Sequence, residues 1–345
     1  MSRAFPNWLW VPATLLSTIA VAASGQTTAG IDRTTFVPLG GLEQWISIRG
    51  EDHSSPVLLV VHGGPGEAQW PAAEVYEPWE KAFTVVQWDQ RGAGHTFGRY
   101  GTNTPDVTLD RISKDGVELA EYLCQQLAKK KIIVLGHSWG SIVATRMVQM
   151  RPDLFAAYLG TGQVTTWAAM VNTQYDLVLA KAREDGDQAT IREIEANRPD
   201  PANAQEYFSF SSKYHVRSLW PPPDQAWLQH LRSQLPELQA SNPEQSKYLE
   251  EGMKFQSEHV LHDQLAINLP KTACEIQTAY FVIQGRDDIV TPTQAVIDYF
   301  KCVKAPKKEL ILIPNAGHFA FMTAAGEFLE LLKSKVRPVA LARGA

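Results

Sequence analysis

Residues 131–141 read KIIVLGHSWGS, and this stretch decides the fold. A run of apolar β-formers at 132–135 leads into GHSWG at 136–140, and a helix-compatible stretch follows until Pro152. The pattern is G-x-S-x-G between a strand and a helix, where the two glycines permit a strained turn. Such a turn exposes the serine hydroxyl with a helix amino terminus behind it, so Ser138 is the candidate nucleophile.

The rest of the chain shows strand and helix patterns in an alternating order. The apolar run VLLVV is typical of a strand buried on both faces, and Gly40-Gly41 suits a tight hairpin turn. Thr108 is the expected N-cap of an amphipathic helix. Strands are predicted at 34–39, 42–48, 57–61, 83–88, 132–135, 155–159, 279–283 and 309–313, and helices at 109–127, 141–150 and 293–302. This order predicts an α/β fold with a mostly parallel central sheet flanked by helices.

Residues 165–269 interrupt this alternation. Buried β-type runs are missing there, charged and long polar side chains accumulate, and prolines punctuate helical stretches. A segment of this length is too long for a loop in a compact domain. We expect an inserted helical cap at 165–269, which divides the core into residues 30–164 and 270–345.

The strand at 57–61 runs into the loop HGGPG at 62–66. Glycines leave backbone N–H groups unobstructed, which is what an oxyanion-binding site requires. The N–H groups of Gly64 and of Trp139, the residue after the nucleophile, are the expected donors. The alternatives are a simple sharp turn or a weak phosphate nest, although no GKS or GKT follows as in a P-loop.

Partners for Ser138 follow two late strands. Asp287 and Asp288 come after the strand at 279–283, and His318 follows the strand at 309–313. His318 is the expected general base, and one of the two aspartates would orient it. The two acids are not separated by their own sequence context.

Other polar residues receive structural interpretations. In the loop DQRGAGH at 89–95, Asp89 and Arg91 are expected to form an ion pair. His62 is expected to anchor its own loop, and His137 to point elsewhere than the nucleophile.

Five motifs in order resemble the proline iminopeptidase-like group of the α/β-hydrolase superfamily, which are serine peptidases. The resemblance implies an α/β-hydrolase fold, with Asp288 as the triad acid through the pattern Gly-x-x-Asp. It also implies oxyanion contact from residues 62–66 and a substrate pocket shaped by the cap. The insertion lacks the Trp-Glu pair near which that group binds the substrate amino terminus. The motifs are HGGPG at 62–66, DQRGAG at 89–94, GHSWGS at 136–141, GRDD at 285–288 and GHF at 317–319.

The sequence therefore predicts a serine hydrolase that acts through Ser138, His318, Asp288 and an acyl-enzyme. The expected activity is that of an aminopeptidase of proline iminopeptidase type, releasing a small amino-terminal residue from short peptides or amides. The alternatives are a small-molecule esterase, amidase or lactonase, and a non-catalytic binding protein on a hydrolase scaffold. The mechanism requires no cofactor and no metal.

Composition limits the partners. The chain has 345 residues, a net charge of −5 and 20% charged residues, so it has no basic footprint for nucleic acid. A small peptide or small molecule is the expected substrate, and the sequence leaves the oligomeric state undetermined.

The first residues have the pattern of an export signal. Arg3 precedes an apolar run at 8–23 that contains Ala20-Val21-Ala22, a small-x-small cleavage site. We expect a signal peptide at 1–22 and an exported, periplasmic or secreted protein without stable membrane insertion after cleavage. An uncleaved anchor is the alternative.

Three cysteines are present: Cys124, Cys274 and Cys302. All three could be ordinary buried thiols. However, Cys274 precedes a predicted strand and Cys302 ends the helix after it, so both return to one edge of the sheet. A disulfide between them is compatible with an oxidising compartment.

Overall fold

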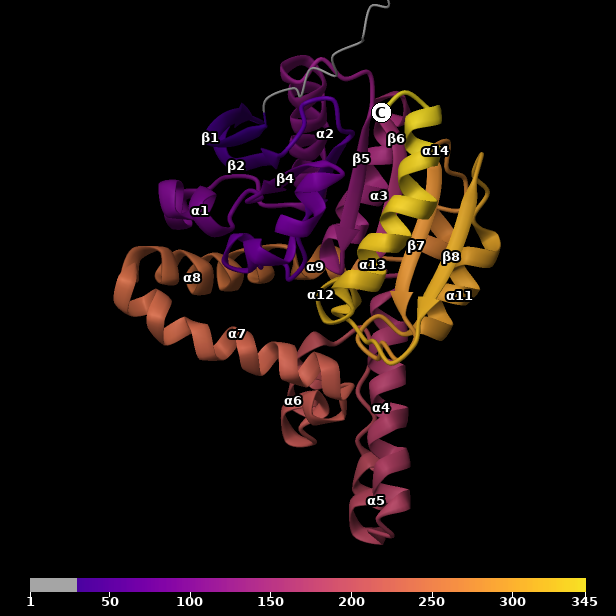
Figure 1. Cartoon of the computed structure of the whole chain (residues 1–345). Helices are drawn as coiled ribbons and strands as arrows, with labels where there is room; N and C mark the ends of the chain where they lie inside the picture. The colour runs from indigo at the N-terminus through magenta and orange to yellow at the C-terminus, as the bar shows by residue number, and fades with distance from the viewer. Residues whose placement is uncertain (1–29) are drawn as a thin grey trace, which may run out of the picture.

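The computed structural model describes residues 30–345, and the leader expected at 1–22 lies outside these residues. An eight-stranded sheet forms the centre, in the order β1-β2-β4-β3-β5-β6-β7-β8 (Figure 1). Strands β1, β2 and β4 pair antiparallel, and the remaining neighbours pair parallel. The strands are β1 (Ile31–Leu39), β2 (Leu42–Gly50), β3 (Val57–Val61), β4 (Thr84–Trp88), β5 (Ile132–His137), β6 (Phe155–Thr161), β7 (Ala279–Gly285) and β8 (Lys308–Ile313).

Every strand predicted from the sequence is present, and the predicted fold class is confirmed. Gly40 and Gly41 form the β1–β2 turn with φ values of +54° and +78°, which glycine adopts at little steric cost. Because β3 to β8 run parallel, the loops that follow them leave the sheet at one edge. The candidate residues after β3, β5, β7 and β8 therefore gather there.

Helices cover both faces of the sheet. On one face, Ile112, Met147 and Val296 belong to the apolar core that includes Leu59 and Val134. On the other face, α13 and α14 cover a second core. The N-cap predicted at Thr108 is confirmed, since its hydroxyl accepts from Arg111 N at 3.2 Å. The α-helices of the core are α1 (Gly94–Tyr100), α2 (Leu109–Gln126), α3 (Trp139–Met150), α11 (Thr293–Cys302), α12 (Ala320–Thr323), α13 (Ala325–Leu331) and α14 (Arg337–Ala342).

Between β6 and β7 the chain forms a helical insertion (Figure 1). Its two ends meet at an antiparallel bridge between Thr166 and Asn268, and Leu269 N donates to Thr165 O at 3.0 Å. None of the helices within residues 30–345 is long and apolar enough to cross a membrane. The helices of the insertion are α4 (Trp167–Glu184), α5 (Gln188–Ala196), α6 (Ala204–Lys213), η5 (Val216–Leu219), α7 (Pro222–Ser241), α8 (Pro243–His259), α9 (Leu261–Ala266) and α10 (Leu269–Thr272).

The insertion has two parts that pack differently. Helices α4 to α6 and η5 enclose a small apolar core of their own, which includes Tyr175, Ile194 and Phe210. Helix α8 instead packs directly on the domain built around the sheet. A Cβ built on Gly66 would lie 2.6 Å from the Cα of Met253 in α8, so only glycine allows this approach.

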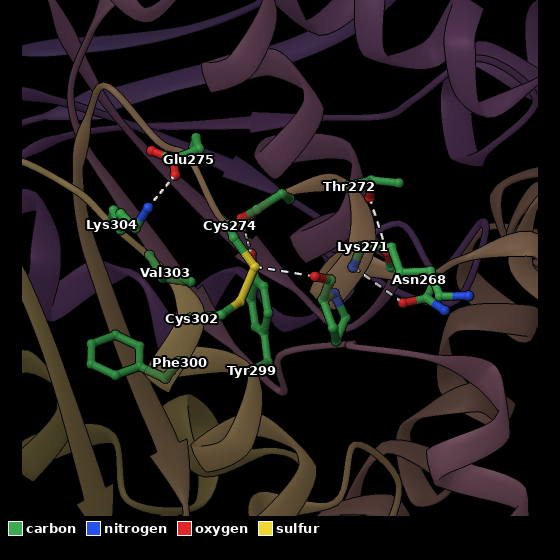
Figure 2. The surroundings of a disulfide bond; sticks show 12 residues. Asn268, Lys271, Thr272, Cys274, Glu275, Tyr299, Phe300, Cys302, Val303 and Lys304 are labelled. Atoms are coloured by element: carbon green, nitrogen blue, oxygen red, sulfur yellow. Dashed lines mark hydrogen bonds and ion pairs between the residues drawn. A yellow bond between two sulfur atoms is a disulfide. The ribbon is translucent and has the colours of Figure 1, made fainter.

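Cys274 and Cys302 form a disulfide with a Cα–Cα separation of 5.4 Å (Figure 2). The bond joins the segment before β7 to the end of α11, as the sequence suggested. Lys304 N donates to Cys274 O at 2.7 Å beside it. Cys124 is a free, half-buried thiol.

Candidate active site

The turn between β5 and α3 holds Ser138 in a strained conformation. Its φ and ψ are +52° and −121°, a combination that a residue with a Cβ rarely adopts. A Cβ on Gly136 would lie 2.5 Å from Gly140 O, and one on Gly140 would lie 2.0 Å from Val61 O. Both glycines of the motif are therefore required for close packing. Ser138 is half-buried.

His318 and Asp288 meet at the same edge. The distance from His318 Nδ1 to Asp288 Oδ2 is 3.0 Å, and both side chains are buried. Thr291 N and Gln284 Nε2 each donate to the Asp288 carboxylate at 2.8 Å, which fixes its orientation. Asp287 is exposed. Of the two adjacent acids, Asp288 is the one that contacts the histidine.

Three nearby carboxylates affect the pKa of His318. Burial lowers the pKa of His318, but Asp288, Asp224 and Glu67 raise it, and the net effect is a pKa above the ordinary value. The favourable interaction with these charges stabilises the imidazolium, which is the form that a general base reaches during proton transfer.

The ring of His318 lies near Ser138 without a hydrogen bond to it. Within residues 30–345, the ring bonds to Asp288 and Thr291, and none of these bonds reaches the Ser138 hydroxyl. Ser138 N donates to Thr161 O at 3.1 Å, and a Cβ on the next residue, Gly162, would lie 2.9 Å from His318 Cε1. In unliganded sites such bonds are often long and tighten when substrate binds.

The HGGPG loop lies against Ser138. A Cβ on Gly63 would lie 3.0 Å from Ser138 Cβ, so the loop backbone comes close to the serine. Gly64 is exposed with φ +105°, and the Gly64–Pro65 peptide bond is cis. Trp139 is the first residue of α3, where an N–H group has no acceptor in its own helix. Both expected oxyanion donors therefore belong to segments that border Ser138.

His62 anchors this loop, as expected. Its Nδ1 donates to Gly63 O at 3.0 Å, and its Nε2 accepts from Gln90 N at 3.2 Å, which fixes one neutral tautomer. Burial lowers the pKa of His62, in agreement with the neutral form.

The expected ion pair between Asp89 and Arg91 is wrong. Arg91 Nε instead donates to Asp115 Oδ2 at 2.7 Å, and both side chains are buried. Asp89 Oδ2 accepts from His95 N at 2.7 Å and contacts His95 Nδ1 at 2.8 Å. A buried carboxylate on α2 competes for the guanidinium because an unpaired charge there would be costly.

The family model described as alpha/beta hydrolase fold matches residues 56–325. The chain belongs to this family. Probable aminopeptidase YbaC of Bacillus subtilis (strain 168) is 26% identical over 302 residues, covering 87% of this chain and 94% of that protein. A proline iminopeptidase of Lactobacillus helveticus is 23% identical over 305 residues, covering 86% and 95%.

A solved structure shows the same fold. A proline iminopeptidase-related protein of Thermus thermophilus superposes with a TM-score of 0.61 at 18% identity, covering 91% of this chain and 98% of that one. The sequence resemblance to proline iminopeptidase-like α/β hydrolases is therefore confirmed.

His137 of this α/β hydrolase has a position that the sequence did not reveal. Its Nε2 donates to the backbone oxygen of His318 at 3.2 Å, and the two rings are 4.9 Å apart. Burial lowers its pKa well below the ordinary value, so the ring is neutral. His137 therefore supports the backbone of His318 through its carbonyl group.

Two acids near His318 were also missed. Glu67 directly follows the HGGPG loop and is half-buried. Burial raises its pKa, while His318 and Arg217 of η5 lower it. Asp224, in the first turn of α7, is fully buried. The position of Glu67 next to the loop was a signal in the sequence, whereas nothing local distinguishes Asp224.

Aromatic rings complete the surroundings. The ring centroids of Trp220 and Phe319 lie 6.4 Å and 5.3 Å from that of His318. Among the described residues, no group of three or more His, Cys, Asp or Glu side chains is placed to hold a metal ion.

Proposed function

We propose that this α/β hydrolase is a serine hydrolase whose triad is Ser138, His318 and Asp288. The observation that carries the proposal is the buried Asp288–His318 pair at the sheet edge where the strained turn presents Ser138. Such an arrangement supplies a nucleophile, a base and a group that orients the base.

The proposed reaction has two halves. The Ser138 hydroxyl attacks the substrate carbonyl while His318 takes its proton, and the Gly64 and Trp139 N–H groups stabilise the oxyanion. The leaving group departs with the proton from His318, and an acyl-enzyme remains. Water then attacks this ester, again with His318 as base, and Ser138 is restored.

We further propose that the substrates carry a free amino terminus, as in an aminopeptidase of proline iminopeptidase type. Glu67 supports this because it places a half-buried carboxylate beside the oxyanion loop and close enough to influence His318. The cap acids Glu193 and Glu206 are instead engaged with Lys213 and with the backbone N–H of Asp200. The similarity to a probable aminopeptidase and to a proline iminopeptidase also supports this proposal.

Labelling and kinetics test both levels of the proposal. A fluorophosphonate probe should label Ser138 in the wild type and not in Ser138→Ala. Prolyl and alanyl anilides should be cleaved faster than short-chain nitrophenyl esters of acids without an amino group. Absence of labelling would reject the triad, and absence of cleavage of every free-amino anilide would reject the aminopeptidase.

Glu67→Gln separates binding of the amino group from the chemical steps. It should raise KM for amino-terminal anilides about tenfold or more, since a charged hydrogen bond is lost, and leave KM for a neutral ester within about twofold. Glu258→Gln, an exposed acid on α8, is the matched control and should change neither. Equal effects on both substrates would contradict the assignment.

An esterase or amidase acting on small neutral molecules is the second candidate. The rings of Trp220 and Phe319 favour it, because they offer apolar contact near His318. The same substrate comparison decides between the two: fast ester cleavage with no activity on free-amino anilides would establish the second candidate.

We also propose that the protein works in an oxidising compartment outside the cytosol. The Cys274–Cys302 disulfide supports this location, because such bonds persist mainly in exported proteins. Fractionation of the source cells with a tagged full-length chain tests it, and protein found only in the cytosol with three free thiols would refute it.

A further inference from the structure

Asp224 occupies an unusual position in the cap. It is the buried residue of the 20-residue helix α7, and its carboxylate is fully covered. Its Oδ2 accepts from His318 N at 2.6 Å, and its Oδ1 from Phe319 N at 3.4 Å. A Cβ on Gly317 would lie 2.2 Å from Asp224 Oδ2, so the preceding glycine makes room for the carboxylate.

Burial of this carboxylate is costly, and its bonds go to the residue proposed as the base. Burial raises the pKa of Asp224, and the hydrogen bond from His318 N opposes this effect. The other end of the His318 residue is held by His137, whose Nε2 donates to His318 O at 3.2 Å. The backbone of His318 is therefore fixed by the cap at its N–H and by the nucleophile strand at its carbonyl.

We propose that Asp224 is a positioning residue that couples the cap to the catalytic base. By holding the backbone of His318, it keeps the imidazole where Nδ1 meets Asp288 at 3.0 Å and Nε2 is left to take the Ser138 proton. This inference rests on the proposed function, because it assumes that His318 is the base. A displacement of about 1 Å at such a group costs on the order of 100-fold in rate.

The carboxylate also acts on His318 through its charge. The groups that face His318 are Asp288 on the loop after β7, Glu67 on the loop after β3, neutral His137 on β5 and Asp224 on α7. All three carboxylates raise the pKa of His318. Loss of the Asp224 charge with the side chain otherwise preserved should therefore lower that pKa.

Two substitutions separate the backbone contact from the charge. Asp224→Ala removes both, and kcat for a neutral ester should fall about 10- to 100-fold with KM within about twofold. Asp224→Asn keeps an acceptor oxygen, so its loss of kcat should be smaller, while the acid limb of its kcat/KM profile should move to lower pH.

Asp263→Asn is the matched control. Asp263 is also a cap carboxylate that accepts a hydrogen bond from a backbone N–H of the core. Its donor is Leu109 N at 2.8 Å, which begins α2 and is not part of the His318 loop. The Asp263→Asn substitution should leave kcat and the acid limb of the kcat/KM profile unchanged. Its melting temperature, compared with that of the wild type, reports any general loosening of the cap.

The outcomes distinguish this inference from the proposed function. If the wild type is labelled by a fluorophosphonate and both Asp224 variants are labelled at the same rate, only the positioning role falls. If Asp263→Asn causes an equal loss of kcat, the effect is general and the role also falls. If the wild type is not labelled, the proposed function itself falls. Should Asp224→Ala not fold, unchanged kcat together with an unmoved acid limb in Asp224→Asn would still overturn the inference.

Discussion

Replacing Cys274 and Cys302 together by serine removes the bond that ties the segment before β7 to the end of α11. The bond closes a loop with a sequence separation of 28, and the unfolded chain gains conformational freedom when the loop opens. The chain-entropy relation gives a loss of about 3.6 kcal/mol at 25 °C for a loop of this size. For a chain of this length, with an unfolding entropy of about 0.7 kcal/mol/K, the melting temperature should fall by about 5 °C.

Calorimetry on the oxidised wild type and the double variant measures this change directly. Dithiothreitol should lower the melting temperature of the wild type towards that of the double variant and leave the variant itself unaffected. Cys124→Ser is the control, because Cys124 is free, and it should stay within about 1 °C of the wild type. Hydrolysis at 25 °C should be unchanged, since the disulfide lies at the sheet edge opposite the candidate site.

Three results would refute this reasoning. The first is a double variant that melts with the wild type, and the second is a wild type indifferent to reductant. The third is a shift in Cys124→Ser as large as that of the double variant. Each would mean that the disulfide does not stabilise the protein by restricting the conformational freedom of the unfolded chain.

Three further predictions concern the candidate site. Asp288→Asn should lower kcat about 10⁴-fold, because the histidine loses its orienting carboxylate, whereas Asp287→Asn should stay within about twofold in the same steady-state assay; the reverse order would exchange their roles. Because carboxylates raise the pKa of His318 and only the neutral ring is a base, kcat/KM should fall as pH drops through a value above 6.5, and an acid limb below 6.5 would contradict this. Gly162→Ala should lower both kcat and the melting temperature, since its Cβ would lie 2.9 Å from His318 Cε1 at a φ of +52°; unchanged kinetics would show that the ring has room to move.

Local sequence patterns were sufficient to predict the strands of the sheet and the edge at which distant candidate residues lie. The run at 57–61 is buried on both faces and is the strand β3 in full. Because parallel strands release their loops at one edge, the order of strands alone brought Asp288 and His318 together. The choice between Asp287 and Asp288 needed the family pattern, since both follow the same strand.

Long-range competition explains what the sequence did not predict. Arg91 has Asp89 two residues away, yet it binds Asp115 of α2, which is buried and needs a cation. Asp224 is 94 residues from His318, and its helix is otherwise rich in exposed polar side chains. No spacing rule relates such residues, because their contact depends on how the insertion folds back over the sheet.

Helices α4, α5, α6 and η5 pack around an apolar core of their own, so this part of the insertion can be exchanged as a unit. Residues 167–219 therefore supply much of their own packing, and the insertion as a whole joins the core at the Thr166–Asn268 bridge. Helix α8 has no such independence, because Gly66 admits its backbone at close range. Foreign helices could therefore replace residues 167–219 to alter substrate selectivity. Helix α8 and Asp224 must be kept, because both contact the core directly.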